Sequence, residues 1–290
     1  IAQTSFGRIS GTVTDPAGAI IAGATVEVKN AGTQATRTTK TDGSGFYSFS
    51  DLPIGTYSVD VNQTGFRRQQ RTNLEIAADA RLTVSFQMQL GDVTQTVEVT
   101  AQAGEALNTT SGELSHVIDT KQVQNLALNG RNSPKLMPMV PGAVVTNPTQ
   151  FSVTTSLAAT NQSLNGNRSD TNNLTVDGAY NSVAGSNGSL VNNVSSEFIQ
   201  EVKLQTSNAS AEYGRFSGAA FNIVTKNGTN EFHGAAFEYF RNDILDARNF
   251  FAANKTELRF NDFGYDLGGP TIKNKLFFFV GDEWKRMRQQ

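Results

Sequence analysis

GTVTDPAGAIIAGATVEV (11–28) and TKTDGSGFYSFSDLPIGTYSVDV (39–61) decide the fold of the first ninety residues. Both stretches alternate short β-prone runs with clusters of turn-forming residues. Within 24–29 and 57–61 apolar residues recur at every second position, which places one face of a strand in a core and the other in water. Over the first ninety residues this pattern predicts seven strands, at 7–14, 25–30, 36–41, 45–50, 55–62, 67–75 and 80–89. Seven short strands in fewer than a hundred residues favour a β-sandwich.

The order of these two stretches resembles the carboxypeptidase regulatory-like domain, a transthyretin-like or Ig-like β-sandwich. We place this domain at residues 1–90, and the resemblance implies a stability and spacing module without catalytic residues. Asp42-Gly43-Ser44-Gly45 offers oxygen atoms at a short spacing that suits Ca²⁺. The alternating ligands and the closing Glu of a calcium loop are missing, so a hairpin turn is expected instead.

Composition excludes several classes of function. The 290 residues correspond to about two domains. With 24 basic and 26 acidic side chains, the chain has almost no net charge and therefore no strong electrostatic field that would attract nucleic acid. The absence of cysteine excludes disulfides, thiolate-bound zinc and thiol catalysis. The two histidines, His116 and His233, lie far apart, and no nucleophile has a neighbouring base. We therefore predict no enzyme activity, no metal and no cofactor.

Residues 91–114 are predicted to connect two domains and to begin with a strand. Thr96, Val97, Glu98, Val99, Thr100 and Ala101 follow a period of two. One interpretation is a final strand and a flexible linker. The other is an exposed strand whose unpaired edge a partner binds by β-augmentation. The hexapeptide resembles the TonB box, the segment by which a periplasmic coupling protein engages TonB-dependent outer-membrane receptors.

Residues 115–230 are predicted to form a small α/β domain. We expect a strand at 117–119, a helix at 121–126 capped by Thr120, and short helices at 133–137 and 194–200. Six motifs follow one another in this region: MVPGAV (139–144), GNRSD (166–170), LTVDG (174–178), EVKL (201–204), EYGR (212–215) and AAFNIVTK (219–226). In this order they resemble the plug domain of TonB-dependent receptors, specifically the Oar-like branch, whose members also carry a regulatory-like domain. Polar insertions at 146–163 and 179–193 leave the ligand unspecified.

Single residues of this region suggest local roles. Asp177 precedes Gly178 and is expected to accept backbone N–H groups of its turn. Arg168, Glu201 and Arg215 either form charge pairs between plug and barrel wall or are solvated surface residues. His116 lies beside a predicted strand and has no second ligand nearby, which argues against a metal site.

Residues 231–290 contain aromatic segments of strand length at 232–240, 260–271 and 275–285. Phe237, Tyr239, Phe263 and Tyr265 alternate with small or polar residues, which is typical of a barrel wall with apolar residues facing lipid. Breaks are expected at 268–270 and 273–275, and an outer loop or short helix at 244–254.

DFGYDLGGP (262–270), followed by KLFFFV (275–280), resembles the first barrel hairpin of Oar-like receptors. A plugged barrel of about 22 strands needs more than about 200 residues for its strands alone. Residues 231–290 provide about three strands. We therefore expect an incomplete barrel, belonging to a longer receptor or completed by other copies.

Two hypotheses follow. The first is the N-terminal part of a TonB-dependent outer-membrane receptor, whose plug gates ligand uptake. Its partners would be a TonB-type coupling protein, an unidentified ligand and outer-membrane lipid. A small residue before Gln3 resembles the end of a signal-peptide cleavage site, so we expect export to the outer membrane or cell surface of a double-membrane bacterium. The second is a structural surface protein whose sandwich and open-edged strands self-associate into a fibre.

Overall fold

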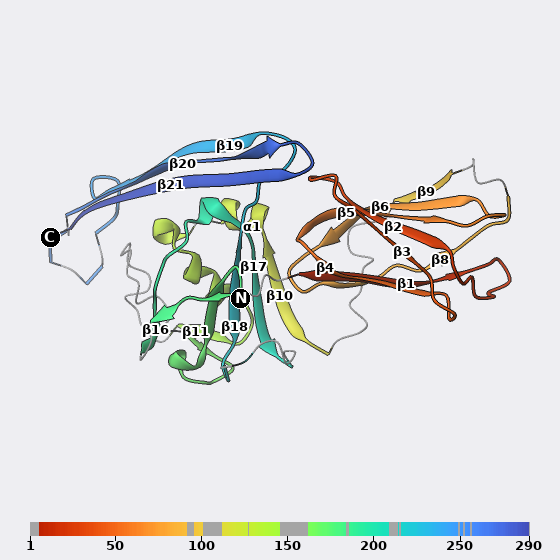
Figure 1. Ribbon diagram of the computed structural model, residues 1–290. Helices are drawn as coiled ribbons and strands as arrows, with labels where there is room; N and C mark the ends of the chain where they lie inside the picture. The colour runs from red at the N-terminus through yellow and green to blue at the C-terminus, as the bar shows by residue number, and fades with distance from the viewer. Residues whose placement is uncertain are drawn as a thin grey trace. The chain divides into compact units, whose positions relative to one another are not determined.

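The computed structural model describes residues 6–91, 96–100, 112–126, 128–145, 162–183, 186–208, 214, 216–248, 250–251, 253–255 and 257–289. The chain is mainly β and divides into two compact units, residues 1–113 with 272–276 and residues 114–271 with 277–290 (Figure 1). Within the described ranges, none of the helices has the length and apolar character needed to cross a membrane.

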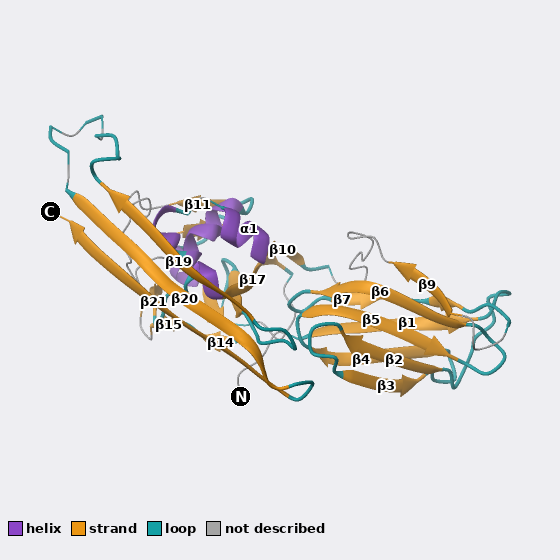
Figure 2. Cartoon of the chain, turned by 90° about the horizontal axis from the view of Figure 1, so that it is seen from above, coloured by secondary structure: helices purple, strands orange, loops and turns teal. Residues whose placement is uncertain are grey.

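The first unit is a β-sandwich of two sheets, as predicted. One sheet has the order β4 (Phe46–Leu52), β1 (Gly7–Thr14), β7 (Arg81–Thr83), with β8 (Phe86–Gln87) also paired to β1. The other has the order β3 (Thr36–Lys40), β2 (Thr25–Asn30), β5 (Gly55–Asn62), β6 (Arg68–Ile76), β9 (Thr96–Thr100) (Figure 2). The alternating residues predicted to face inward, such as Val26, Val28, Val59 and Val61, are buried in the core.

Two local features of the sandwich depend on close packing. The strand expected at 80–89 is divided into β7 and β8. Between them the chain passes close to Gly11, where an added Cβ would lie 1.9 Å from the Val84 carbonyl oxygen. The turn at Asp42 is confirmed. Its Oδ1 accepts hydrogen bonds from Ser44 N (2.8 Å), Ser44 Oγ (2.7 Å) and Phe46 N (2.9 Å).

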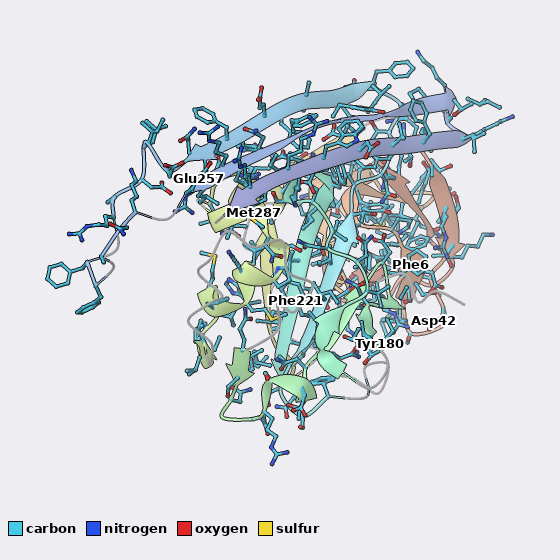
Figure 3. The ribbon with its side chains drawn as sticks, turned by 90° about the vertical axis from the view of Figure 1, so that its left-hand side faces the viewer. Phe6, Asp42, Tyr180, Phe221, Glu257 and Met287 are labelled. Atoms are coloured by element: carbon cyan, nitrogen blue, oxygen red, sulfur yellow. The ribbon has the colours of Figure 1, made fainter. Side chains whose placement is uncertain are left out.

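The second unit contains a five-stranded mixed sheet, here called the mixed sheet. Its order is β10 (Leu114–Asp119), β17 (Ile199–Ser207), β18 (Ala220–Thr225), β13 (Asn173–Val176), β14 (Ala179–Tyr180), and β13 and β18 are parallel. Two short hairpins accompany it, β11 (Ala143–Val145) with β12 (Gln162–Leu164) and β15 (Ser182–Val183) with β16 (Ser186–Leu190). Phe221, labelled in Figure 3, lies in the core with Val123 and Leu136.

The helices of this unit differ from expectation. Helix α1 (Thr120–Asn125) is capped by Asp119, not Thr120, because Asp119 and Gln122 form a reciprocal capping box. The Thr120 hydroxyl donates to the Gln200 carbonyl oxygen. The helix expected at 194–200 is only a 3-10 turn, Ser196–Phe198, because the chain from Ile199 onward pairs with β10 and β18. The helix expected at 133–137 is a 3-10 helix, Ser133–Met139, which contains Pro138.

The remaining strands form a three-stranded sheet, here called the long-stranded sheet, of β19 (His233–Asn242), β20 (Leu258–Ile272) and β21 (Leu276–Gln289). It lies across one end of the mixed sheet (Figures 1 and 3). The break expected at 268–270 is wrong, because these residues lie inside β20. Gly269 instead makes room for the ring of Phe232, whose Cδ1 would lie 2.4 Å from an added Cβ. The described part of 244–254 is a loop, and the sheet does not close into a barrel.

Candidate functional site

Residues 96–100 of the TonB-box-like segment form an edge strand of the five-stranded sheet of the first unit. Strand β9 runs parallel to β6, with Thr96 opposite Arg68, Glu98 opposite Gln70 and Thr100 opposite Thr72. The strand predicted here is therefore present, but one of its two edges is paired within the sandwich. Ala101, the last residue of the segment, lies outside the described residues.

The chain reaches β9 from a point beside the start of β6. The Arg67 N–H donates to the Gln89 carbonyl oxygen (2.8 Å), and the Gly91 N–H donates to the Gly65 carbonyl oxygen (3.2 Å). Phe66 and Leu90 form an antiparallel bridge between these two bonds. Residues 89–91 are thus held against residues 65–67, next to the strand with which β9 pairs.

A second cluster of polar side chains joins the mixed sheet to the long-stranded sheet, and Arg131 is at its centre. Arg131 follows Gly130 in a turn where both residues have positive φ, 70° and 48°. Its guanidinium forms an ion pair with Glu197 and donates from Nε to Ser196 Oγ (2.9 Å). It also lies 4.3 Å from the ring centroid of Tyr239, whose hydroxyl donates to Glu197 Oε1 (2.8 Å). Arg131 and Glu197 are only 11% and 9% exposed.

Further contacts continue along the same interface. The Ser195 hydroxyl donates to Glu283 Oε1 (2.5 Å). Lys226 Nζ, which follows β18, lies 3.4 Å from Asp266 Oδ2 on β20. Within the long-stranded sheet, Lys285 Nζ lies 2.7 Å from Glu283 Oε2 and 3.9 Å from Asp262 Oδ2. The interface is therefore built largely from charged groups and hydrogen bonds.

One aromatic side chain adds an apolar contact to this interface. The Phe198 ring packs edge-on against Phe237 and Phe279, with centroid distances of 6.5 and 6.2 Å. Gly281 makes this approach possible, since an added Cβ would lie 2.5 Å from the Phe198 ring. Phe198 thus anchors the end of the mixed sheet on the long-stranded sheet.

The orientation of the aromatic residues corrects the expectation that all four face lipid. Phe237 and Tyr239 contact the mixed sheet and so point inward. Phe263 and Tyr265 point the other way and pack against Trp284, at centroid distances of 5.7 and 6.0 Å. The physical reason is strand register: Tyr239 pairs with Asp262 and Phe237 with Gly264, so the residues flanking Phe263 share the inward face.

The residues singled out individually from the sequence take other roles. Asp177 has φ 49°, and its carboxylate accepts hydrogen bonds from Thr225 N (2.9 Å) and Thr225 Oγ1 (2.8 Å) on β18, not from its own turn. Glu201 is buried in β17, so the solvated-surface alternative is wrong for this residue. Arg168 directly precedes the 3-10 turn Ser169–Thr171, and His116 is an exposed residue of β10.

Arg215 lies outside the described residues. Across the described ranges, no three His, Asp or Glu side chains are grouped so that they could hold a metal ion.

Sequence reasoning missed most of the interface between the two sheets. The residues concerned are Arg131, Ser195, Glu197, Lys226, Asp262, Asp266 and Glu283. One signal was available, because in DFGYD (262–266) the acidic residues alternate with the aromatic ones and thus occupy the opposite face of a strand. Nothing in the local sequence around Arg131 indicates that it pairs with Glu197.

Comparison with known proteins gives matches at both ends of the chain. The family described as carboxypeptidase regulatory-like domain matches residues 8–89, and the family described as outer membrane beta barrel domain matches residues 224–290. The chain is 29% identical over 303 aligned residues to the TonB-dependent transporter Oar of Myxococcus xanthus, a match that covers 97% of this chain and 26% of that protein. The chain therefore spans about a quarter of the length of this relative.

Two solved structures are also similar. The siderophore receptor PirA from Acinetobacter baumannii matches with a TM-score of 0.46 and 18% identity, covering 60% of this chain and 24% of that chain. A streptococcal ancillary pilin matches with a TM-score of 0.26 and 13% identity, covering 30% and 33%. The matches in sequence confirm the predicted resemblance to Oar-like receptors and place the chain in the outer membrane of a Gram-negative bacterium.

Proposed function

We propose that this chain, a homologue of the TonB-dependent transporter Oar, is the N-terminal part of an outer-membrane transporter whose plug gates ligand uptake. In this proposal residues 1–90 form the regulatory-like sandwich and 91–114 the coupling segment. Residues 115–230 form the plug, and 231–290 supply the first barrel strands. The observation that carries the proposal is the contact between the mixed sheet and the inward face of β19–β21, made through Arg131, Glu197 and Tyr239.

The chemistry of this contact suits two surfaces that must separate and close again. Hydrogen bonds and ion pairs exchange with water when an interface opens, so the net contribution of each is only about 0.5–1.5 kcal/mol, or about 1.5–3 kcal/mol where one partner is charged. Opening an apolar interface of the same size costs about 25 cal/mol for each Å² of apolar surface exposed. Lys226–Asp266 and Ser195–Glu283 are contacts of the first kind, while Phe198 provides an apolar contact.

In the proposed mechanism a ligand binds on the outer side, and force applied to residues 96–101 rearranges the plug. The coupling protein would bind these residues by strand addition, in which backbone hydrogen bonds provide affinity. The ligand itself is not specified by any group of residues in the described part of the interface.

The coupling step can be tested by a pull-down of the purified chain with the periplasmic domain of a TonB-type coupling protein. The matched control is a chain in which residues 96–101 are scrambled, which preserves composition and charge. We expect the unmodified chain to bind and the scrambled chain not to bind. Binding that survives scrambling would contradict the proposed role of this segment.

A second candidate function is self-association into a surface fibre through open strand edges. It is favoured by the order β19-β20-β21, which leaves one edge each of β19 and β21 unpaired within the part of the chain described. Electron microscopy of the purified chain distinguishes the two functions. Ordered polymers formed without detergent would support the fibre, whereas discrete monomers in detergent would contradict it.

A further inference from the structure

The position of β9 leaves one of its edges available for another strand. In the sheet order β3-β2-β5-β6-β9, β9 is the outermost strand, and β6 is its one neighbour among the strands described (Figure 2). All five residues from Thr96 to Thr100 are in register with Arg68–Thr72. Because a strand has two edges, the edge of β9 that faces away from β6 can accept backbone hydrogen bonds from a further strand.

The part of β6 that holds β9 is fixed by the rest of the sandwich. Residues Arg68–Thr72 are half-exposed or exposed, whereas Leu74 and Ile76 of the same strand are buried in the core. Arg68 Nε lies 2.8 Å from both carboxylate oxygens of Asp60 on β5, and Asp60 pairs with Gln70 across the two strands. This edge of β6 is therefore held by β5 and does not depend on β9 for its position.

The segment is also kept close to this edge by its own chain. Gln89 and Gly91 are hydrogen-bonded to Arg67 and Gly65, so only residues 92–95 separate this anchored point from β9. A short connection of this kind raises the effective concentration of a strand at its docking edge to about the millimolar range. The short connection thus lowers the entropic cost of pairing β9 with β6.

We propose that the sandwich presents the TonB-box-like strand: β6 holds Thr96–Thr100 extended, and the coupling protein adds its own strand to the opposite edge of β9. This inference rests on the proposed function of the segment. The partner it requires is a protein with an exposed strand edge, recognised mainly through backbone hydrogen bonds. Since the strand is already ordered before the encounter, its entropic cost of binding is lower than for a disordered peptide.

The opposite arrangement is occlusion, in which the coupling protein must first remove β9 from β6. A disulfide that fixes β9 to β6 separates the two arrangements, and the chain is suited to this because it contains no cysteine. The pair Gln70→Cys and Glu98→Cys joins directly opposite positions. Neighbouring strands lie about 4.8 Å apart, within the Cα separation that a disulfide spans. A second pair, Gln69→Cys and Val97→Cys, places the bridge on the other face of the sheet.

The measurement is the Kd of each variant for the purified periplasmic domain of the coupling protein, oxidised and after reduction with dithiothreitol. Presentation predicts that the oxidised form of at least one pair binds within about threefold of its reduced form, or up to about tenfold more tightly. Occlusion predicts that oxidation weakens binding more than about tenfold for both pairs, and this result would overturn the inference.

Hydrogen exchange of the bound complex provides an independent readout. Presentation predicts that amides of Arg68–Thr72 that are protected in the free chain stay protected when the coupling protein binds. Loss of this protection would mean that β9 leaves β6, and it would overturn the inference while the proposed function stands. If neither the unmodified chain nor the reduced variants bind, the proposed function fails, and the inference fails with it.

Discussion

Replacing Glu197 with Gln tests how much the buried Arg131–Glu197 ion pair, which Tyr239 of the long-stranded sheet contacts, contributes to the stability of the second unit. The Glu197 carboxylate forms an ion pair with Arg131 and accepts a hydrogen bond from the Tyr239 hydroxyl (2.8 Å). Gln has nearly the same shape but no charge. The substitution E197Q therefore leaves the Arg131 guanidinium, which is 11% exposed, without its counter-ion.

The expected magnitude follows from the burial of the pair. Removing one partner of a buried ion pair costs about 3–5 kcal/mol. Arg131 keeps its bond to Ser196 Oγ and its position 4.3 Å from the Tyr239 ring. This cation–π contact is worth about 0.5–2 kcal/mol, so we expect a loss near the lower limit, about 3 kcal/mol. Y239F keeps the ring and loses one hydrogen bond to a charged group, which should cost about 1.5 kcal/mol.

The assay is urea unfolding in detergent, followed by fluorescence of Trp284. Trp284 is the single tryptophan of the chain, and it stacks on Phe263 in the long-stranded sheet, so its signal reports the second unit. The matched control is Arg68→Met, which breaks the ion pair of Arg68 with Asp60 in the first unit. This control should leave the Trp284 transition unchanged.

A double-mutant cycle determines whether the pair itself is responsible. If Arg131 and Glu197 interact as described, combining R131M with E197Q should cost about 2–3 kcal/mol less than the sum of the two single substitutions. Strictly additive losses would refute the electrostatic reasoning. So would an E197Q transition that coincides with that of the unmodified chain.

Four further substitutions test the two units. Gly11→Ala should destabilise the sandwich by about 3 kcal/mol or more, because the new Cβ would lie 1.9 Å from the Val84 carbonyl oxygen. Gly43→Ala meets no atom within 4 Å and should be neutral within about 0.5 kcal/mol, as measured by hydrogen exchange of β1 amides. Asp177→Ala removes two hydrogen bonds to Thr225 and should lower the Trp284-monitored stability by about 2 kcal/mol; an unchanged transition would contradict this. Hydrogen bonds from the Ser44 hydroxyl and from backbone N–H groups lower the pKa of Asp42 from 3.8. Asp42→Ala should therefore destabilise the sandwich at neutral pH, and the difference should shrink as the pH falls below 3.8 and through the lowered pKa of folded Asp42.

Local sequence was sufficient for much of the sandwich. The predicted ranges of β1, β2 and β5 coincide with the observed strands, because period-two alternation and the flanking turn residues are both local signals. The same reasoning failed at 80–89, where the chain passes close to Gly11 and the strand divides into β7 and β8. It also failed at 194–200, where β10 and β18 draw the chain from Ile199 onward into a sheet. In both places a distant segment overrides the local preference.

The sequence by itself determined the order of the modules, the strand at residues 96–100 and the resemblance to Oar-like receptors. Only the tertiary structure decided that β6 holds this strand, that Phe237 and Tyr239 face inward, and that Arg131 meets Glu197. These facts depend on register and on partners 66 residues apart for Arg131 and Glu197, and 88 apart for Ser195 and Glu283. Alternation of apolar and polar residues along a strand shows that its two faces differ, but it does not indicate which distant element covers each face.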